Sequence, residues 1–133
     1  MPGYSGTPLP KKLGIKDGFR VRLVDSPPEV VKELKPSLDK CEATEGKPPL
    51  DFAIVFTKSK ASLSKEFKRI TKELAPAGML WVSWPKRSSG VPTDLSEDTI
   101  REIGLASGLV DVKVCAVSDV WSGLKFVRRL KDR

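Results

Sequence analysis

The sequence predicts an α/β protein built on an open, mostly parallel sheet, and three observations support this fold class. Two near-continuous apolar runs, 50–56 and 79–84, indicate strands that are covered on both faces. An apolar stripe at helical spacing lies between them, and such a strand–helix–strand unit requires parallel pairing with a right-handed crossover. Two short apolar segments near the C-terminus, 112–117 and 124–127, predict an antiparallel hairpin. We therefore expect about five or six strands, with helices on both faces.

The chain of 133 residues suits one domain of ordinary size. Prolines and glycines crowd the N-terminus, so residues 1–14 are expected to form an irregular arm, pinned to the body by Tyr4, Leu9 and Leu13. Residues 15–133 then form the single α/β domain.

The first strand is expected over 19–24, where apolar and basic residues alternate. Asp25 or Ser26 is expected to cap the next helix, because both residues precede a proline pair that suits a first helical turn. Pro36 should end or kink that helix, since proline removes a backbone donor. A short strand is then expected over 40–44.

The strand over 50–56 leads into a helix with one apolar stripe, formed by Leu63, Phe67, Ile70 and Leu74, and the turn at 76–78 should end it.

After the strand over 79–84, which Pro85 should stop, Asp94 is expected to cap another helix, with Glu97 completing a capping box. Gly108 is placed to end that helix. Trp81 and Trp84 must project to opposite faces of their strand because their separation is odd. All the tryptophans are expected to pack in the core.

The residue types present exclude several kinds of catalytic site. The chain has no histidine, which removes Ser-His-Asp and Cys-His chemistry. Its cysteines, Cys41 and Cys115, match no metal or redox spacing, so both are expected to be free thiols in a reducing cytoplasm. No apolar run approaches the roughly 20 residues that span a bilayer, and no secretory signal is evident. We predict no catalytic residue, no metal and no membrane partner.

The net charge of +7 favours anionic partners. The densest cationic stretch is 58–72, which suits a solvated helix face better than a nucleic-acid patch. Specific nucleic-acid binding is not expected, because no reader motif or aromatic platform accompanies the charge.

Two segments of the chain, L-D-F-A-I-V at 50–55 and L-A-P-A-G-M-L at 74–80, resemble the class I S-adenosylmethionine-dependent methyltransferase fold, a Rossmann-like sheet. In that fold an F-D-x-V-type strand is followed by a helix and an L-x-P-G-G-x-L turn, and the closing hairpin fits as well. The resemblance implies S-adenosylmethionine as cofactor, held by a glycine-rich loop after the first strand and an acidic residue after the second. Here the chain departs from the pattern, because no glycine follows the first strand until Gly46. Glu42 or Glu45 would have to supply the acidic group, and the missing loop disfavours this cofactor.

A second resemblance covers nearly the whole chain. The segments that carry it are 4–9, 12–15, 84–86, 89–90, 93–95, 108–111, 113–115 and 121–127. They resemble a small bacterial family catalogued as a domain of unknown function. This resemblance implies a bacterial cytosolic protein and supplies no reaction.

The candidate ligand site lies where the parallel strands end, since ligands of open α/β sheets bind at the carboxyl ends of strands. Its main part combines cations and hydroxyls ahead of a helix, a combination that attracts phosphates and carboxylates. The residues predicted to line this site are Asp25, Ser26, Lys58, Ser59, Lys86, Arg87, Ser88, Ser89, Gly90 and Thr93. For Asp25 a cap or turn role is favoured over a ligand contact, and for Lys58 and Ser59 a solvated helix entrance is favoured.

Three functional hypotheses follow. The first is a non-catalytic, Rossmann-like cytosolic protein that binds a small anionic or nucleotide-like ligand at this edge of the sheet. The second is an interaction module that self-associates through the N-terminal arm and the terminal hairpin. The third is a divergent S-adenosylmethionine-dependent methyltransferase.

Overall fold

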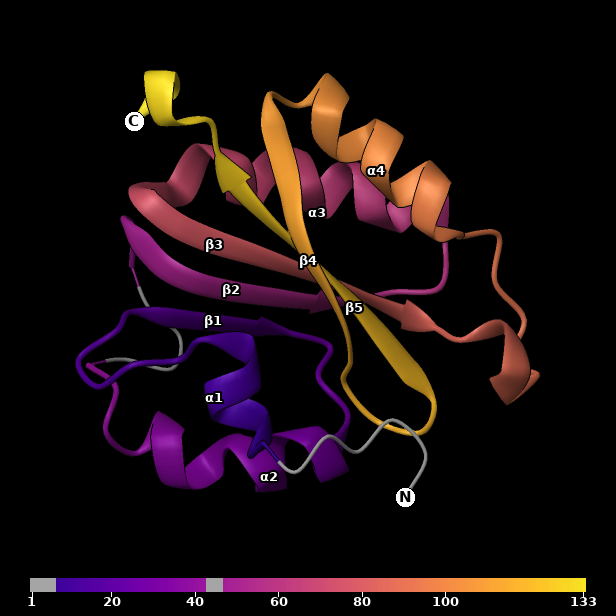
Figure 1. Cartoon of the computed structure of the whole chain (residues 1–133), viewed down its shortest axis with the longest axis horizontal. Coiled ribbons are helices and arrows are strands. Elements are labelled where there is room, and N and C mark those ends of the chain that lie inside the picture. The colour runs from indigo at the N-terminus through magenta and orange to yellow at the C-terminus, as the bar shows by residue number, and fades with distance from the viewer. Residues whose placement is uncertain (1–6, 43–46) are drawn as a thin grey trace.

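Five strands form one sheet in the order β1-β2-β3-β5-β4 in the computed structural model of the chain, which describes residues 7–42 and 47–133 (Figure 1). The strands are β1 Val21–Val24, β2 Leu50–Phe56, β3 Leu74–Pro85, β4 Leu109–Ala116 and β5 Trp121–Arg128. The α-helices are α1 Leu9–Leu13, α2 Pro28–Leu38, α3 Lys60–Glu73 and α4 Glu97–Ala106. The short 3-10 turns are η1 Arg87–Ser89 and η2 Leu130–Asp132. Helices α3 and α4 cover one face of the sheet, and α1 and α2 lie on the other, as expected from the sequence.

The strand–helix–strand prediction is confirmed, because β2 and β3 are neighbours and parallel, with Ile54 opposite Trp81. Strand β1 also runs parallel to β2. The C-terminal hairpin is confirmed too, since β4 and β5 pair antiparallel, and β5 pairs antiparallel with β3. The fold class is therefore the predicted open, mostly parallel α/β sheet.

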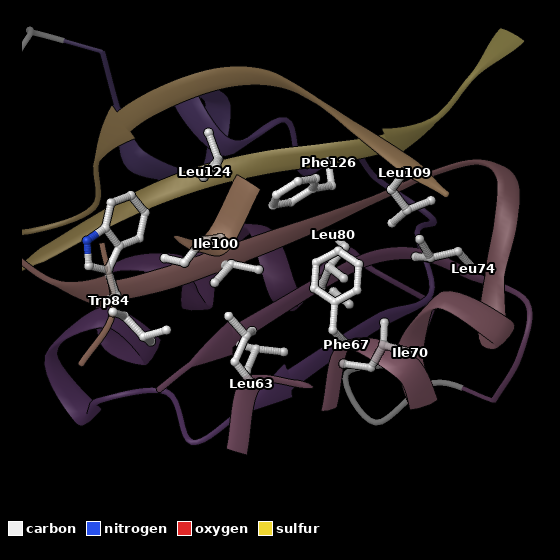
Figure 2. Close-up of a cluster of buried hydrophobic side chains, with 14 of the residues drawn as sticks. Leu63, Phe67, Ile70, Leu74, Leu80, Trp84, Ile100, Leu109, Leu124 and Phe126 are labelled. Carbon is white, nitrogen blue, oxygen red and sulfur yellow. The ribbon is translucent and has the colours of Figure 1, made fainter. Parts of the chain in front are cut away.

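The core between the sheet and helices α3 and α4 is shown in Figure 2. Leu63, Phe67 and Ile70 of α3 are fully buried, as their spacing predicts. The Phe67 ring meets the ring of Phe126 edge-to-face, with ring centroids 5.1 Å apart. Gly104 lies so close to Phe126 that any β-carbon there would overlap the ring, so α4 packs directly on β5.

The second core lies on the opposite face, and Trp81 is its largest fully buried side chain. Trp84 belongs to the first core, so the two side chains project to opposite faces as predicted. Trp81 Nε1 donates a hydrogen bond to the Leu13 carbonyl over 2.8 Å, which holds α1 against the sheet. Trp121 is half-buried and packs edge-to-face on Phe56, which confirms a packing role.

The prediction of an irregular arm over 1–14 is wrong for Leu9–Leu13, which forms α1. The helix follows two ordinary rules: a proline lies in its first turn, and Gly14 ends it in the left-handed conformation at φ 89°. Leu9 and Leu13 are buried, so their pinning role is confirmed. Tyr4 lies outside the described residues.

Several expected elements have other bounds in the structure, among them the strands expected over 19–24, 112–117 and 124–127, which span 21–24, 109–116 and 121–128. Helix α2 continues through Pro36 to the buried Leu38, because the proline lies in the last turn, where it removes only one helical hydrogen bond. Leu74 is buried but begins β3, and segment 76–78 lies inside that strand rather than ending the helix at a turn. Residues 40–42 form turns and bends instead of a strand, and 43–44 lie outside the described part of the chain.

Strand β4 is an edge strand, and Val112 and Val114 on it are about half exposed, at 55% and 50%. An uncovered edge of this kind is consistent with self-association, which stays a prediction. None of the described helices is long and apolar enough to cross a membrane.

Candidate functional site

The carboxyl ends of β1, β2 and β3 emerge at one edge of the sheet, because the three strands are parallel (Figure 1). Asp25 follows β1, Thr57 follows β2 and Lys86 follows β3. This is the edge at which the sequence predicts a ligand site. Within the described residues, however, Asp25 and Lys86 line different hollows, and the predicted residues fall into separate places.

One hollow at this edge, which we call the Lys86 hollow, has a volume of about 500 Å³. Of the predicted residues, Lys86, Arg87, Gly90 and Thr93 line it. Its wall also includes Trp84, Ser96, Glu97 and Ser122, which were not predicted. Ser122 reaches the hollow because β5 pairs with β3 and places it opposite Trp84, a long-range pairing with no local sequence signal.

The positive charge of the Lys86 hollow is not neutralised within it. Lys86 is half-buried and Arg87 is exposed, and neither side chain forms an ion pair with any residue in the described ranges. The carboxylate of Glu97 is already paired, since it accepts a hydrogen bond from Arg101 Nη2 over 2.7 Å. The hollow therefore carries a net positive charge that favours an anion.

The hydroxyl groups predicted to bind an anion are used to build the loop. Ser89 Oγ donates to the Lys86 carbonyl over 2.6 Å and accepts from the Val91 N–H over 3.2 Å. Thr93 Oγ1 donates to the Lys58 carbonyl over 2.6 Å. Ser88 does not line the hollow and is exposed. The hydroxyls of Ser89 and Thr93 thus already have backbone partners, and Lys86 and Arg87 are the cationic side chains that line the hollow.

Asp94 does not cap α4. Its Oδ1 accepts from the Lys60 N–H over 2.8 Å, at the first residue of α3. Ser96 caps α4 instead, accepting from the Thr99 N–H over 3.2 Å. The capping-box pattern was misleading because the free N–H groups at a helix end can be bound by a residue from another segment of the chain. Asp94 binds such a group of α3 and leaves the cap of α4 to Ser96.

Lys58 and Ser59 take structural roles, in agreement with the helix-entrance interpretation. The Lys58 carbonyl accepts from Thr93, and Ser59 caps α3 by accepting from the Ser62 N–H over 3.1 Å. Neither residue lines the Lys86 hollow.

Asp25 and Ser26 line a different hollow of about 540 Å³, formed with Lys35 of α2 and Asp39, which follows that helix. Asp25 adopts a left-handed conformation with φ 55°, unusual for a residue with a side chain. The cap of α2 is Pro27, with no side-chain hydrogen bond, so the predicted cap role of Asp25 or Ser26 is wrong. Ser26 Oγ is buried and has no hydrogen-bond partner in the described part of the chain.

The other groups that could carry chemistry are the two cysteines, Cys41 and Cys115, and the acidic residues. Both cysteines are free and half-buried, and burial raises the pKa of each thiol above its ordinary value. A raised pKa keeps a thiol protonated and unreactive at neutral pH. Across residues 7–42 and 47–133, no group of acidic residues and cysteines is arranged to hold a metal ion.

No protein family model matches this chain, and no curated protein sequence matches it. Solved structures do share its fold. Fibrillarin of Aeropyrum pernix, with natively bound S-adenosyl-L-methionine, is 14% identical over 86% of this chain and 69% of its own, with a TM-score of 0.56. A SAM-dependent methyltransferase of Aquifex aeolicus is 16% identical over 87% and 85%, with a TM-score of 0.57. Magnesium protoporphyrin IX methyltransferase of Synechocystis PCC 6803, with bound SAH, is 11% identical over 91% and 78%, with a TM-score of 0.59.

These likenesses show that the chain has the Rossmann-like fold of S-adenosylmethionine-dependent methyltransferases. The resemblance recognised in the sequence is therefore confirmed at the level of the fold. The likeness to a small bacterial family stays a prediction.

The residues beside β1 do not fit the cofactor pattern expected from the sequence resemblance. Pro27 and Pro28 have no backbone N–H to offer a ligand, and no glycine lets the backbone approach one closely. Glu42 lies at the amino end of β1, where its N–H donates to the Phe19 carbonyl over 2.9 Å. It cannot supply the acidic group expected at the carboxyl edge, and Glu45 lies outside the described residues.

Proposed function

We propose that the chain binds a small ligand carrying a phosphate or carboxylate in the Lys86 hollow. The observation that carries this proposal is the pair of cations at the carboxyl end of β3, Lys86 and Arg87, which have no carboxylate partner among the described residues. An arginine can hold such a group with two parallel hydrogen bonds, and a lysine adds a compact charge.

The shape of the hollow supports a ligand with an apolar part beside its anionic group. Trp84 lines the wall and is only 7% exposed, so a small part of a large apolar side chain is open to the hollow. A nucleotide-like molecule combines the two properties, which is why this class is proposed ahead of a simple inorganic ion.

The test is a thermal-denaturation screen with phosphate, nucleotides, S-adenosylmethionine and S-adenosylhomocysteine. A ligand that binds only the native state raises the midpoint temperature of unfolding. At a ligand concentration one hundred times its Kd, the free energy of unfolding rises by about 2.7 kcal/mol. The shift should disappear in the double variant Lys86→Ala/Arg87→Ala. The matched control Lys32→Ala/Lys131→Ala removes the same charge from α2 and η2 and should keep the shift. An equal shift in both variants would place the site elsewhere.

A second candidate, a divergent S-adenosylmethionine-dependent methyltransferase, is favoured by the structural neighbours over a role without catalysis. The turn after β1 argues against the usual way of holding the cofactor. Calorimetric titration with S-adenosylhomocysteine, in the wild type and in Lys86→Ala/Arg87→Ala, separates the two candidates. Saturable binding that persists in the double variant supports the methyltransferase, and no binding together with a shift by another anion supports the first proposal.

A further inference from the structure

Basic side chains from helix α3 and strand β1 line one hollow of about 570 Å³ on the surface of the protein. Helix α3 contributes residues three or four positions apart, which share one face of a helix. Arg22 reaches the same hollow from β1. The lining residues are Arg22, Lys65, Lys68, Arg69, Lys72 and Glu73. We call Lys65, Lys68 and Lys72 the α3 lysine face.

The carboxylates at this hollow already have partners. Glu73 accepts a hydrogen bond from Arg22 Nη1 over 2.6 Å. This bond is the main cause that lowers the pKa of Glu73, so the carboxylate is ionised and paired at neutral pH. Glu66, also on α3, pairs with Arg69 Nη2 over 2.5 Å. Because each pair cancels one positive and one negative charge, the α3 lysine face supplies the remaining positive charge of the hollow.

The α3 lysine face is an extended and accessible strip. Its three lysines are exposed, and none of them forms an ion pair with any residue within 7–42 and 47–133. Lys65 and Lys72 are about two helical turns apart, or about 10 Å along the helix axis. Lys68 and Lys72 also line a second hollow of about 500 Å³ between α3 and α4. The positive charge therefore extends along α3 and across it toward α4.

An anion with many repeated charges fits this strip. Duplex nucleic acid carries one negative charge per about 1.7 Å of its axis, so a strip of about 10 Å meets several phosphates. A bilayer surface fits less well, because helices that lie in membranes insert apolar side chains beside their cations. The large apolar residues Leu63, Phe67 and Ile70 of α3 are fully buried in the core. In the described part of the chain, no exposed large apolar residue belongs to α3.

We propose that the α3 lysine face binds the phosphate backbone of nucleic acid without reading its sequence. Phosphate contacts fix the position of a protein on nucleic acid, whereas sequence is read by side chains that bind base edges. Asparagine and glutamine, the usual readers of adenine, are absent from the chain. The arginines of the hollow, which could read guanine, are held by carboxylates. No residue of the α3 lysine face lines the Lys86 hollow, so the two sites are separate.

The test is equilibrium binding of the full chain to a fluorescently labelled DNA duplex of random sequence, measured by anisotropy over a series of salt concentrations. Each phosphate contact contributes about 0.9 to the steepness of log K against log salt concentration. The variant Lys65→Ala/Lys68→Ala/Lys72→Ala should therefore lose about 2.7 of this steepness and bind about 10-fold or more weakly at low salt. Alanine has the highest helix propensity, so α3 should remain folded in the variant. A second duplex of unrelated sequence should bind the wild type equally well.

Two matched variants separate this face from a general effect of charge. Lys11→Ala/Lys32→Ala/Lys40→Ala removes the same charge from exposed lysines of α1, α2 and the turn after α2, and it should keep the salt dependence of the wild type. Lys65→Arg/Lys68→Arg/Lys72→Arg keeps the positive charge of the face and should keep the affinity.

Three results would overturn the proposal. The first is equal binding of the duplex by the alanine variant of the face and by its matched control, the result expected of a solvated helix face. The second is binding of the wild type to vesicles that contain phosphatidylserine, without binding to the duplex. The third is a loss of salt dependence in Lys86→Ala/Arg87→Ala as large as that in the alanine variant of the face, which would place the phosphate contacts at the Lys86 hollow.

Discussion

Asp94 accepts a hydrogen bond from the backbone N–H of Lys60 over 2.8 Å, so the loop after β3 caps the helix that follows β2. The Thr93 hydroxyl, which donates to the Lys58 carbonyl, strengthens the same junction. This contact ties together two of the loops at the carboxyl edge and sets the position of the Lys86 hollow.

Replacing Asp94 by alanine is expected to destabilise the protein by about 0.5–2 kcal/mol, the usual effect of losing a helix cap. Asp94→Asn should cost much less, because its side-chain oxygen still accepts the Lys60 N–H. Urea denaturation of the two variants measures the difference. Equal stabilities for both variants would contradict the capping role.

Gly104→Ala is expected to destabilise the protein by about 1–3 kcal/mol, because a β-carbon at this position overlaps the Phe126 ring. In a Phe126→Leu background, which has a smaller opposing side chain, Gly104→Ala should reduce the free energy of unfolding by less. The effects of the two substitutions are therefore not additive. A double-mutant cycle by denaturant unfolding measures this coupling. Leu105→Ala, at the neighbouring exposed position, serves as the control.

Trp81→Phe should loosen the N-terminal helix from the sheet. The substitution removes the indole donor to the Leu13 carbonyl, and a buried acceptor left without a partner costs about 1–3 kcal/mol. Hydrogen exchange should therefore accelerate in α1 more than in α3. Trp84→Phe, on the opposite face, should not produce this selective change; if it does, the indole bond is not what holds α1.

Glu73 pairs with Arg22 over 2.6 Å, with both side chains mostly buried. The hydrogen bond from Arg22 is the main cause that lowers the pKa of Glu73 below its ordinary value of 4.5. A carboxyl with a lowered folded-state pKa stabilises the fold fully above its unfolded pKa, and this contribution is lost as pH falls through the lowered value. Stability measured from pH 6 down to pH 2 should therefore decline less steeply in Glu73→Gln than in the wild type. Parallel curves for the two proteins would show that the pair contributes nothing to acid sensitivity.

Local sequence patterns were sufficient to predict the strands and helices that define the fold class. The apolar runs of β2 and β3 are continuous because these strands are covered on both faces, and the stripe of α3 has the helical period because only one side meets the sheet. Gly108, at φ 89°, ends α4 where the sequence placed it. Helix α1 has comparable start and stop signals in Pro10 and Gly14. Because the helix is only five residues long, the prolines around it predicted an irregular arm instead.

The candidate site was predicted less completely than the fold. Asp25 and Lys86 both end parallel strands, so the sequence placed them in one crevice. The sheet order puts β2 between their strands, which separates them by two strand spacings, about 10 Å. The hydroxyls of Ser89 and Thr93 were expected to face a ligand, but both donate to backbone carbonyls. Ser89 binds the carbonyl of Lys86 in its own loop, whereas Thr93 binds that of Lys58, which lies nearby only in the folded chain.

The periodicity of apolar residues thus predicts which segments form strands, which face of each helix is buried and which strands run parallel. It can do so because an apolar face is formed by residues that lie close together in the sequence. Contacts between side chains from distant segments depend instead on the order of the strands in the sheet and on the course of the loops. The pairing of Asp94 with Lys60 and that of Arg22 with Glu73 both join segments that are distant in the chain. Only the tertiary structure decides such contacts, because hydrogen bonds and charges act over a few ångströms of space, whatever the separation along the sequence.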